Sequence, residues 1–379
     1  MKRILFIIPS LEVGGTVSAL APVVRFLKQK FIVSIFALDN DARSVEFDDL
    51  LLPKNRLLHC LNCSFSKTNG MERIVAFLIK LLKRFCTYVH TDIETYLYRS
   101  VIKQLDNYDV VVGFQEGNAT KFASLFKNAD RFAWVHCDYS NYPLSGKELH
   151  IYDRFSQIVC VSQYTAQRFK EIYPSLRLRV SHIHNLLNIE RIRELSKAKL
   201  DSSLLEDDVF TIISVGRLHK VKRFNLIPQI ARSLKDRDLK FRWLILGPHY
   251  DDEIYHKLLR EIEILSVADS VKYLGSMNNP YPYFLTSDLL VSLSSTEACP
   301  MIFNESKVLG LPILTTDFGS SYEFVDDKVI GRITDINHIE EMLAEFISNP
   351  QIVDRMKTNI LTTSYNNNSI LTSLQKLFQ

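Results

Sequence analysis

Residues 287–317 constrain the fold of this chain most, because they predict a strand, a loop, a helix and a second strand in close succession. The apolar run at 289–293 is short and flanked by polar residues, which is typical of a buried parallel strand. Apolar residues then recur at helical spacing over about 301–309, and Gly310 followed by Pro312 is a common helix stop. The segment therefore predicts an α/β fold with a parallel sheet.

Two glutamates of this segment are candidates for ligand binding. Glu297 falls in the predicted loop, and Glu305 falls on the first or second turn of the predicted helix. Open α/β sheets bind ligands at the carboxyl ends of their strands, and the free N–H groups of a first helical turn attract anions. The pair is consistent with a sugar-nucleotide site, with the acid and base of a glycoside hydrolase, or with two unrelated surface charges.

A second strand and loop supply cations. The apolar run at 210–215 ends at Gly216 and is followed by Arg217 and Lys222. An arginine can bridge two phosphate oxygens and a lysine acts as a point charge, so this arrangement suits a diphosphate. The same cluster is also compatible with the solvated start of a helix.

The amino-terminal half alternates predicted strands with helical patterns, which favours a parallel, doubly wound domain. After the opening strand, Gly14 and Gly15 form a turn that leads into a helix over about 16–29, interrupted by Pro22. Further strands are expected at 31–37, 110–114, 132–135 and 157–161.

Polar residues follow two of these strands directly. Glu116 comes after 110–114, and His136 and Asp138 come after 132–135. A Rossmann-like domain presents its active-site face at this edge, so all three are candidate site residues. A purely structural role is open for each of them.

Residues 71–90 predict an unusual helix. Arg73, Lys80, Lys83 and Arg84 form a basic stripe beside a broad apolar face, which is the pattern of a helix that lies in a membrane interface. The cations interrupt the apolar run too early for a transmembrane span. The alternative is a deeply buried helix whose cations alone reach water.

Composition excludes several classes of protein. With 46% hydrophobic and 23% charged residues, the 379-residue chain is of the soluble globular type and long enough for two α/β domains. A formal net charge of +3 is too small to indicate nucleic acid as a partner. Of the six cysteines only Cys60 and Cys63 form a CxxC pair, which favours reduced cytosolic thiols over a zinc site.

The stretch SSTEACPMIFNESKVLGLPILTTD closely resembles the signature of glycosyltransferase family 4, and VGRL with Lys222 matches a second motif of that family. The resemblance is strong over 210–320, moderate over 105–140 and weak at the glycine turn. It implies a GT-B fold, in which two Rossmann-like, doubly wound parallel-sheet domains face each other across a cleft. Ala298 departs from the pattern, because the family usually has glycine there.

The resemblance also implies roles for individual residues. Glu297 would contact the transferred sugar, and His136 would contact that sugar or balance charge near the reacting bonds. Glu305 would hold the ribose, and Arg217 and Lys222 would neutralise the leaving diphosphate. Acceptor contacts would come from Glu116 and Asp138. Further donor contacts would come from Gly14, Gly15, Gly275, Ala298, Pro300, Met301 and Ile302.

These implications give a specific functional expectation. Residues 1–188 would bind the acceptor, residues 189–365 would bind a UDP- or GDP-sugar without metal or cofactor, and residues 366–379 would form a helix on the first domain. The enzyme would transfer a hexose or N-acetylhexosamine, with retention of configuration, to a hydroxyl of a lipid-linked glycan in bacterial surface polysaccharide biosynthesis. It would be cytoplasmic and would touch the inner membrane face through residues 71–90.

Two other classes of protein remain as alternatives. A non-catalytic scaffold that binds sugar nucleotides would keep the same fold. A metal-dependent GT-A transferase would need an Asp-x-Asp motif after a strand, and the sequence offers only Asp236 and Asp238, within a charged stretch typical of a surface turn.

Overall fold

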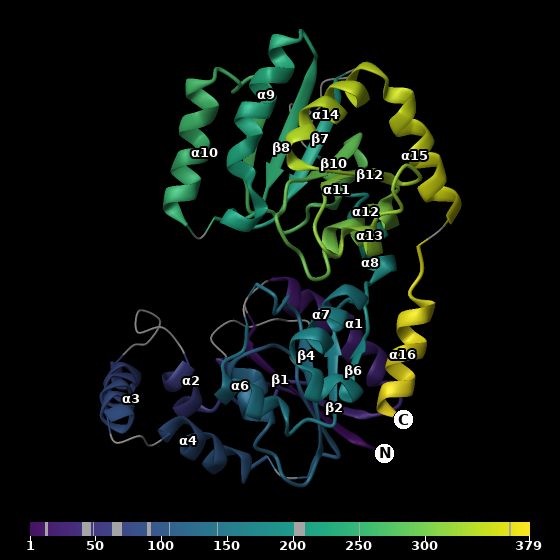
Figure 1. The fold of residues 1–379 in the computed structure, drawn as a ribbon. Helices are drawn as coiled ribbons and strands as arrows, with labels where there is room; N and C mark the ends of the chain where they lie inside the picture. The colour runs from purple at the N-terminus through teal and green to yellow at the C-terminus, as the bar shows by residue number, and fades with distance from the viewer. Residues whose placement is uncertain are drawn as a thin grey trace. The chain divides into compact units, whose positions relative to one another are not determined.

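The computed structural model describes residues 1–11, 14–39, 47, 49–62, 70–88, 92–105, 107–141, 143–200, 209–249, 251–363 and 365–379. The chain divides into two compact units (Figure 1). The amino-terminal unit contains Met1–Leu186 and Asn368–Gln379, and the carboxy-terminal unit contains Leu187–Asn367. The boundaries expected at 188 and 365 lie within two residues of these divisions.

The amino-terminal unit is built on a six-stranded sheet with the order β2-β1-β3-β4-β5-β6. All of its strand pairs are parallel. The strands are β1 (Arg3–Ser10), β2 (Ile32–Asp39), β3 (Val110–Gly113), β4 (Asp130–Val135), β5 (Gln157–Cys160) and β6 (Val180–His182). The helices are α1 (Gly15–Leu27), α2 (Arg56–Asn62), α3 (Gly70–Tyr88), α4 (Ile93–Ile102), α5 (Asn118–Ala123), α6 (Gly146–Tyr152), α7 (Gln163–Ile172), the 3₁₀ helix η3 (Pro174–Arg179) and α16 (Asn368–Phe378).

The last helix of the chain, α16, packs on this sheet. Its buried residues Ile370, Leu374 and Phe378 recur every four positions, so they form one apolar stripe. The ring of Phe378 lies 6.1 Å from that of Phe6 in β1 and 5.6 Å from that of Phe132 in β4. Aromatic burial of this kind fixes the helix on the strands.

The carboxy-terminal unit repeats the architecture, with the strand order β12-β11-β10-β7-β8-β9 and parallel pairing throughout. Its strands are β7 (Phe210–Val215), β8 (Phe241–Leu246), β9 (Val271–Gly275), β10 (Leu289–Ser292), β11 (Ile313–Thr316) and β12 (Gly331–Thr334). Its helices are α8 (Ile189–Leu195), η5 (Lys220–Lys222), η6 (Phe224–Leu226), α9 (Ile227–Asp236), α10 (Asp252–Ile264), α11 (Tyr281–Leu285), α12 (Met301–Leu309), α13 (Ser321–Phe324), η7 (Ile336–His338), α14 (Ile339–Ser348) and α15 (Pro350–Thr363). The two sheets confirm the predicted α/β fold.

Each sheet has one point where the order of its strands reverses. In the carboxy-terminal unit the chain runs outwards from β7 through β8 to β9, then returns to place β10 on the other side of β7. In the amino-terminal unit the corresponding point lies between β1 and β3. Loops that leave the carboxyl ends of two such strands diverge, and ligands of open α/β sheets bind between them.

The CxxC pair is described only in part. Cys60 is buried in α2, and its thiol lies 3.6 Å from the backbone carbonyl oxygen of Glu72. Cys63 lies outside the described residues.

Two glycines bring the ends of β7 and β8 together. Gly247 has a φ of +144°, and a Cβ at this position would lie 1.9 Å from the carbonyl oxygen of Gly216. Both the backbone conformation and the contact therefore require glycine at position 247.

We expect Gly247→Ala to lower the free energy of unfolding by about 3 kcal/mol or more, because the methyl group must displace backbone atoms. The matched control is Gly146→Ala, since nothing lies within 4 Å of a Cβ at Gly146. Urea denaturation of both variants tests the expectation, and equal stability of the two would contradict it.

Candidate functional site

The centre of the candidate site is an ion pair between Lys222 and Glu297. Lys222 ends η5 in the loop after β7, and Glu297 lies in the loop after β10, so the pair lies at the reversal of strand order. Lys222 Nζ contacts Glu297 Oε1, and the two side chains are 19% and 17% exposed. An ion pair that is largely screened from water but still reachable is well placed to interact with a charged ligand.

Hydroxyl groups fix Glu297 in this position. Ser294 Oγ donates to Glu297 Oε1 at 2.8 Å, and Ser320 Oγ donates to the Glu297 carbonyl at 2.7 Å. Thr316 Oγ1 at the end of β11 donates to the Ser294 carbonyl. The loop after β10 is therefore held from two other segments of the unit.

A backbone contact joins the two loops directly. The N–H of Ser295 donates to the carbonyl of Val221 at 2.8 Å. Val221 immediately precedes Lys222, so this bond sets the distance between the lysine and the glutamate loop. The geometry of the ion pair thus depends on the backbone as well as on the two side chains.

Glu305 lies on the second turn of α12, as expected, and it is partly buried. Tyr281 Oη donates to Glu305 Oε1 at 3.3 Å. Burial raises the pKa of Glu305 to about 7, and the hydrogen bond from Tyr281 lowers it only in part. Glu297, by contrast, has the ammonium of Lys222 beside it.

The amino end of α12 carries no side-chain cap. Pro300 occupies the N-cap position without a capping hydrogen bond, and Met301 and Ile302 begin the helix in partly buried positions. The backbone N–H groups of a first helical turn have no partner inside the helix, so they can bind an anion. Ala298 also lies in this loop, in a partly buried position.

Arg217, Gly275 and Arg223 lie on the same edge of the sheet. Arg217 follows Gly216 and is exposed, and within the described part of the chain its side chain has no hydrogen-bond or ionic partner. Gly275 ends β9 with a φ of +74°, and its carbonyl accepts from the N–H of Gly247 at 2.8 Å. Arg223, which follows Lys222 directly, adopts the left-handed conformation with a φ of +53°.

The predicted residues of the amino-terminal unit gather at the ends of β3 and β4. The ring of His136 lies 5.0 Å from the ring of Phe114. Burial lowers the pKa of His136, although the charge of Glu116 and a hydrogen bond to the Phe114 backbone act in the opposite direction. Its buried Nε2 atom has no hydrogen-bond partner among the described residues.

The two carboxylates proposed for the acceptor already have partners in the chain. Glu116 Oε1 accepts from the backbone N–H of His136 and, at 2.7 Å, from that of Cys137. Asp138 is buried and accepts from the N–H of Ser140 at 2.9 Å. Both side chains therefore shape the loop that follows β4.

The described residues leave open space around Gly15 of the glycine turn. Gly14 is the N-cap of α1 in an extended conformation, and nothing lies within 4 Å of a Cβ placed on Gly15. Open space beside a helix amino terminus permits close approach of an external group.

Three residues of the site escaped the sequence analysis. Tyr281 comes from α11, whereas Ser294 and Ser320 come from loops, and each contacts one of the two glutamates. Ser294 is the first residue of the stretch SSTEACPMIFNE that carries both glutamates, so its position in the sequence was a signal for it. Tyr281 and Ser320 carried no signal in the sequence, because isolated tyrosines and serines are common on surfaces.

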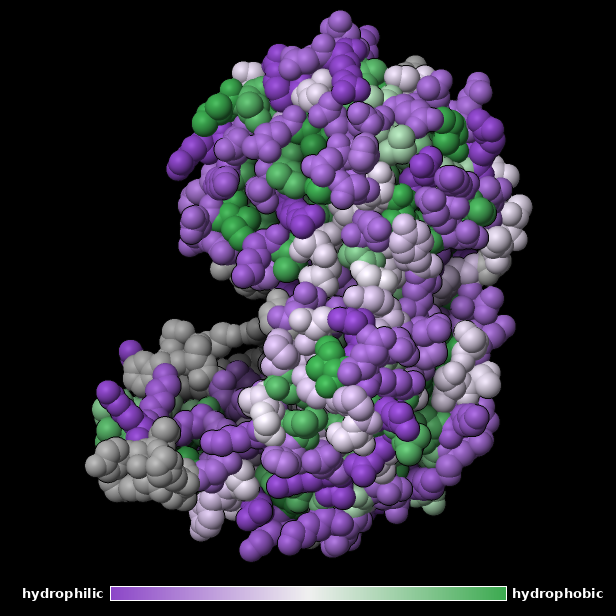
Figure 2. All heavy atoms as spheres, in the orientation of Figure 1, coloured by the Kyte–Doolittle hydropathy of each residue, from purple (hydrophilic) through white to green (hydrophobic). Residues whose placement is uncertain are grey.

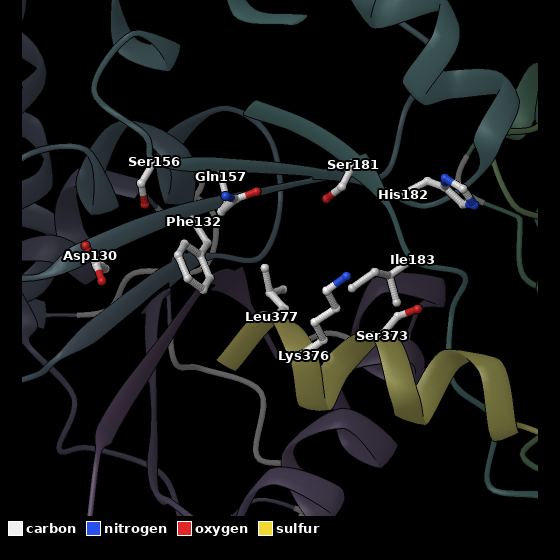
Figure 3. A pocket seen from close by; sticks show the side chains of 10 residues that line it. All are labelled: Asp130, Phe132, Ser156, Gln157, Ser181, His182, Ile183, Ser373, Lys376 and Leu377. Carbon is white, nitrogen blue, oxygen red and sulfur yellow. The ribbon is translucent and has the colours of Figure 1, made fainter. Parts of the chain in front are cut away.

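A pocket of about 510 Å³ lies elsewhere, between α16 and the strands β4 to β6 (Figure 3). None of the predicted site residues lines it. Its lining consists of Asp130, Phe132, Ser156, Gln157, Ser181, His182, Ile183, Ser373, Lys376 and Leu377.

The structure does not favour the Asp-x-Asp alternative. Asp236 ends α9 and pairs with Arg232 one turn earlier, and Asp238 follows in a turn with a φ of +56°. Over the described residues, no group of three or more His, Cys, Asp or Glu side chains is arranged to hold a metal ion.

We expect Glu305→Gln to stabilise the protein much more at pH 8 than at pH 5. The pKa of Glu305 in the folded protein, about 7, is above its ordinary value of 4.5, so wild-type stability falls as pH rises between these values and levels off above 7. Glutamine removes this loss, which amounts to up to about 3 kcal/mol, while it keeps an acceptor for Tyr281. Urea denaturation at both pH values measures the difference, and the same increment at pH 5 and 8 would contradict the expectation.

Comparisons with known proteins agree with this architecture. Residues 196–362 match the family model described as "Glycosyl transferases group 1". A glycosyltransferase of Methanocaldococcus jannaschii, MJ1059, is 24% identical over 206 residues, which are 54% of this chain and 50% of that protein. The lipopolysaccharide core biosynthesis glycosyltransferase LpsE of Rhizobium meliloti is 27% identical over 183 residues, 48% of this chain and 50% of LpsE.

Similarity to solved structures extends over the whole chain. HepE of Anabaena, solved in complex with UDP-glucose, superposes with a TM-score of 0.76 at 13% identity, covering 100% of this chain and 99% of HepE. By contrast, the chain spans about half the length of the curated relatives it matches. The comparisons therefore show the two-domain GT-B fold and, through the family match of the carboxy-terminal unit, support a glycosyltransferase.

Proposed function

We propose that the protein is a retaining glycosyltransferase of family 4 that transfers a hexose or N-acetylhexosamine from a nucleoside diphosphate sugar to a hydroxyl group. The observation that carries the proposal is the Lys222–Glu297 pair at the reversal of strand order, with Glu305 and the uncapped end of α12 beside it. A cation, free N–H groups and carboxylates at one edge provide complementary partners for a diphosphate, a ribose and a sugar.

Each part of the donor has a candidate partner. Lys222 and Arg217 would stabilise negative charge on the leaving diphosphate, assisted by the N–H groups of Met301 and Ile302. Glu305 would accept hydrogen bonds from the ribose hydroxyls. Glu297 would orient the sugar, held by Ser294 and Ser320 so that little ordering is needed on binding.

The proposed reaction needs no nucleophile from the protein. The bond between the anomeric carbon and the diphosphate oxygen breaks, and its electron pair remains on the diphosphate. The acceptor oxygen bonds to the same face of the anomeric carbon, and its proton passes to the departing phosphate. His136, with a neutral Nε2 atom at the end of β4, is proposed to contact the sugar, and no metal is required.

We further propose that the acceptor is a lipid-linked glycan of a bacterial surface polysaccharide and that the protein acts in the cytoplasm at the inner membrane face. The relatives that match this chain include LpsE, named for lipopolysaccharide core biosynthesis, and the putative glycosyltransferase EpsF of Bacillus subtilis. Glu116 and Asp138 lie at the sheet edge where the acceptor is proposed to bind, and Gly14 and Gly15, the proposed donor contacts, follow β1 at the same edge.

Lys222→Met should weaken binding of UDP or GDP at least about tenfold, because the loss of an ammonium–phosphate contact costs about 1.5 to 3 kcal/mol. Lys220→Met is the matched control, since Lys220 belongs to the same turn but is exposed. Thermal shift with a panel of nucleotides measures the change. Equal loss in both variants would contradict the specific role of Lys222.

Glu297→Gln should retain nucleotide binding but lower sugar transfer about a hundredfold, since it removes the charge that orients the sugar.

Transfer by the wild type should persist in EDTA and yield a product with the donor's anomeric configuration, as read by NMR. Loss of transfer in EDTA would show that the reaction requires a metal ion. Nucleotide-sugar binding without turnover on any lipid-linked acceptor would indicate the scaffold alternative instead.

A further inference from the structure

The helix α3 exposes a broad apolar face. Ile74 is 61% exposed, and Phe77 and Leu81 are each 56% exposed. Figure 1 shows α3 on the outer side of α2 and α4 in the amino-terminal unit. Among its described side chains, the large apolar ones that are exposed are Met71, Ile74, Phe77, Leu78, Leu81 and Leu82.

These side chains form one continuous face. At 100° per residue they cover an arc of about 140°. The opposite side of the helix carries the buried residues Ala76 and Ile79, which pack in the core of the unit. The interpretation of this segment as a deeply buried helix is therefore wrong, because α3 is attached by one side only.

Ion pairs hold α3 against its neighbours. Lys83 Nζ contacts Glu94 of α4, and Lys121 of α5 lies 2.9 Å from the same carboxylate. Glu72, the acidic residue of α3, lies 4.0 Å from Lys54 and 3.9 Å from His59 of α2. Lys83, expected in the basic stripe, thus pairs with α4 instead of facing solvent with the other cations. These ion pairs hold α3 in place, so its apolar face has a fixed orientation.

Positive charge borders this face. Arg73, Lys80 and Arg84 are exposed and fall within an arc of about 40° that adjoins Phe77. No described acidic side chain of α3 lies on the exposed side, because Glu72 faces α2. Figure 2 shows hydrophobic and hydrophilic side chains next to each other on this projecting helix, at the lower left.

We propose that α3 docks the protein on an anionic lipid bilayer, with its apolar face in the acyl boundary and its cations at the headgroups. An apolar arc directly beside a strip of exposed cations, on a helix whose one described acid faces α2, is complementary to an anionic bilayer surface. The helix lies on the bilayer, since no described helix is long and apolar enough to cross one. The inference deepens the proposed function by naming the surface that brings the enzyme to a lipid-linked acceptor, but bilayer binding itself requires no sugar transfer.

The test is co-sedimentation of the full chain with vesicles of equimolar phosphatidylglycerol and phosphatidylcholine, compared with phosphatidylcholine alone. We expect wild type to prefer the anionic vesicles and to lose that preference at high salt. Phe77→Asp with Leu81→Asp should lower binding to the anionic vesicles at least tenfold. Arg73→Gln with Lys80→Gln and Arg84→Gln should lower it about a hundredfold.

Ile264→Asp is the matched control, because Ile264 is an exposed aliphatic residue, 68% exposed, on α10 of the other unit. It should bind vesicles as wild type does. Thermal melting checks that all variants are folded, and thermal shift with nucleotide sugars checks the donor site separately. A failure of donor binding alone would overturn the proposed function and leave the docking surface intact.

Two results would overturn the docking proposal. One is vesicle binding that is absent in wild type or unchanged in both α3 variants. The other is that wild type does not bind vesicles but forms a dimer, seen by analytical ultracentrifugation, and that Phe77→Asp with Leu81→Asp dissociates this dimer. That result would assign the apolar face to a second copy of the chain.

Discussion

The reversal of strand order between β7 and β10 determines where chemistry can occur in the carboxy-terminal unit. Parallel strands all end at one edge, but only at this point do neighbouring loops diverge and leave space between them. Lys222 and Glu297 come from those two loops, 75 positions apart in the sequence, and meet there. The topology of the sheet therefore creates the ion pair, and the side chains around it preserve its geometry.

Backbone contacts also maintain the geometry of the Lys222–Glu297 ion pair. The contact between Gly216 and Gly247 allows the ends of β7 and β8 to approach more closely than side chains would permit. Arg223 then takes a left-handed conformation immediately after Lys222, which costs of order 1 kcal/mol in a non-glycine residue. Such strain is tolerated because the bond from Ser295 to Val221 fixes the turn.

The sequence predicted the local features well and the long-range contacts poorly. The strand, loop and helix around Glu297 and Glu305 follow from apolar periodicity and a glycine stop, both of which act within a few residues. Tyr281 and Ser320 lie more than twenty positions from the glutamates that they contact, so only the folded chain brings them together. The α3 segment was ambiguous for the same reason, since periodicity defines an apolar face but not whether another element covers it.

The two glutamates are in contrasting environments, and the contrast agrees with different roles. Glu297 has the ammonium of Lys222 beside it, so a negatively charged group that approaches Lys222 changes the electrostatic surroundings of Glu297 as well. Among the described residues Glu305 has no such cation; its hydrogen-bond partner there is the hydroxyl of Tyr281, and burial raises its pKa to about 7. A partly buried carboxylate of this kind gains most from a ligand that offers hydroxyl donors, because these replace the water lost on burial. Under the proposed function, a diphosphate next to Lys222 and a ribose next to Glu305 would each meet the group that is best suited to it, and the donor would run along α12 in that direction.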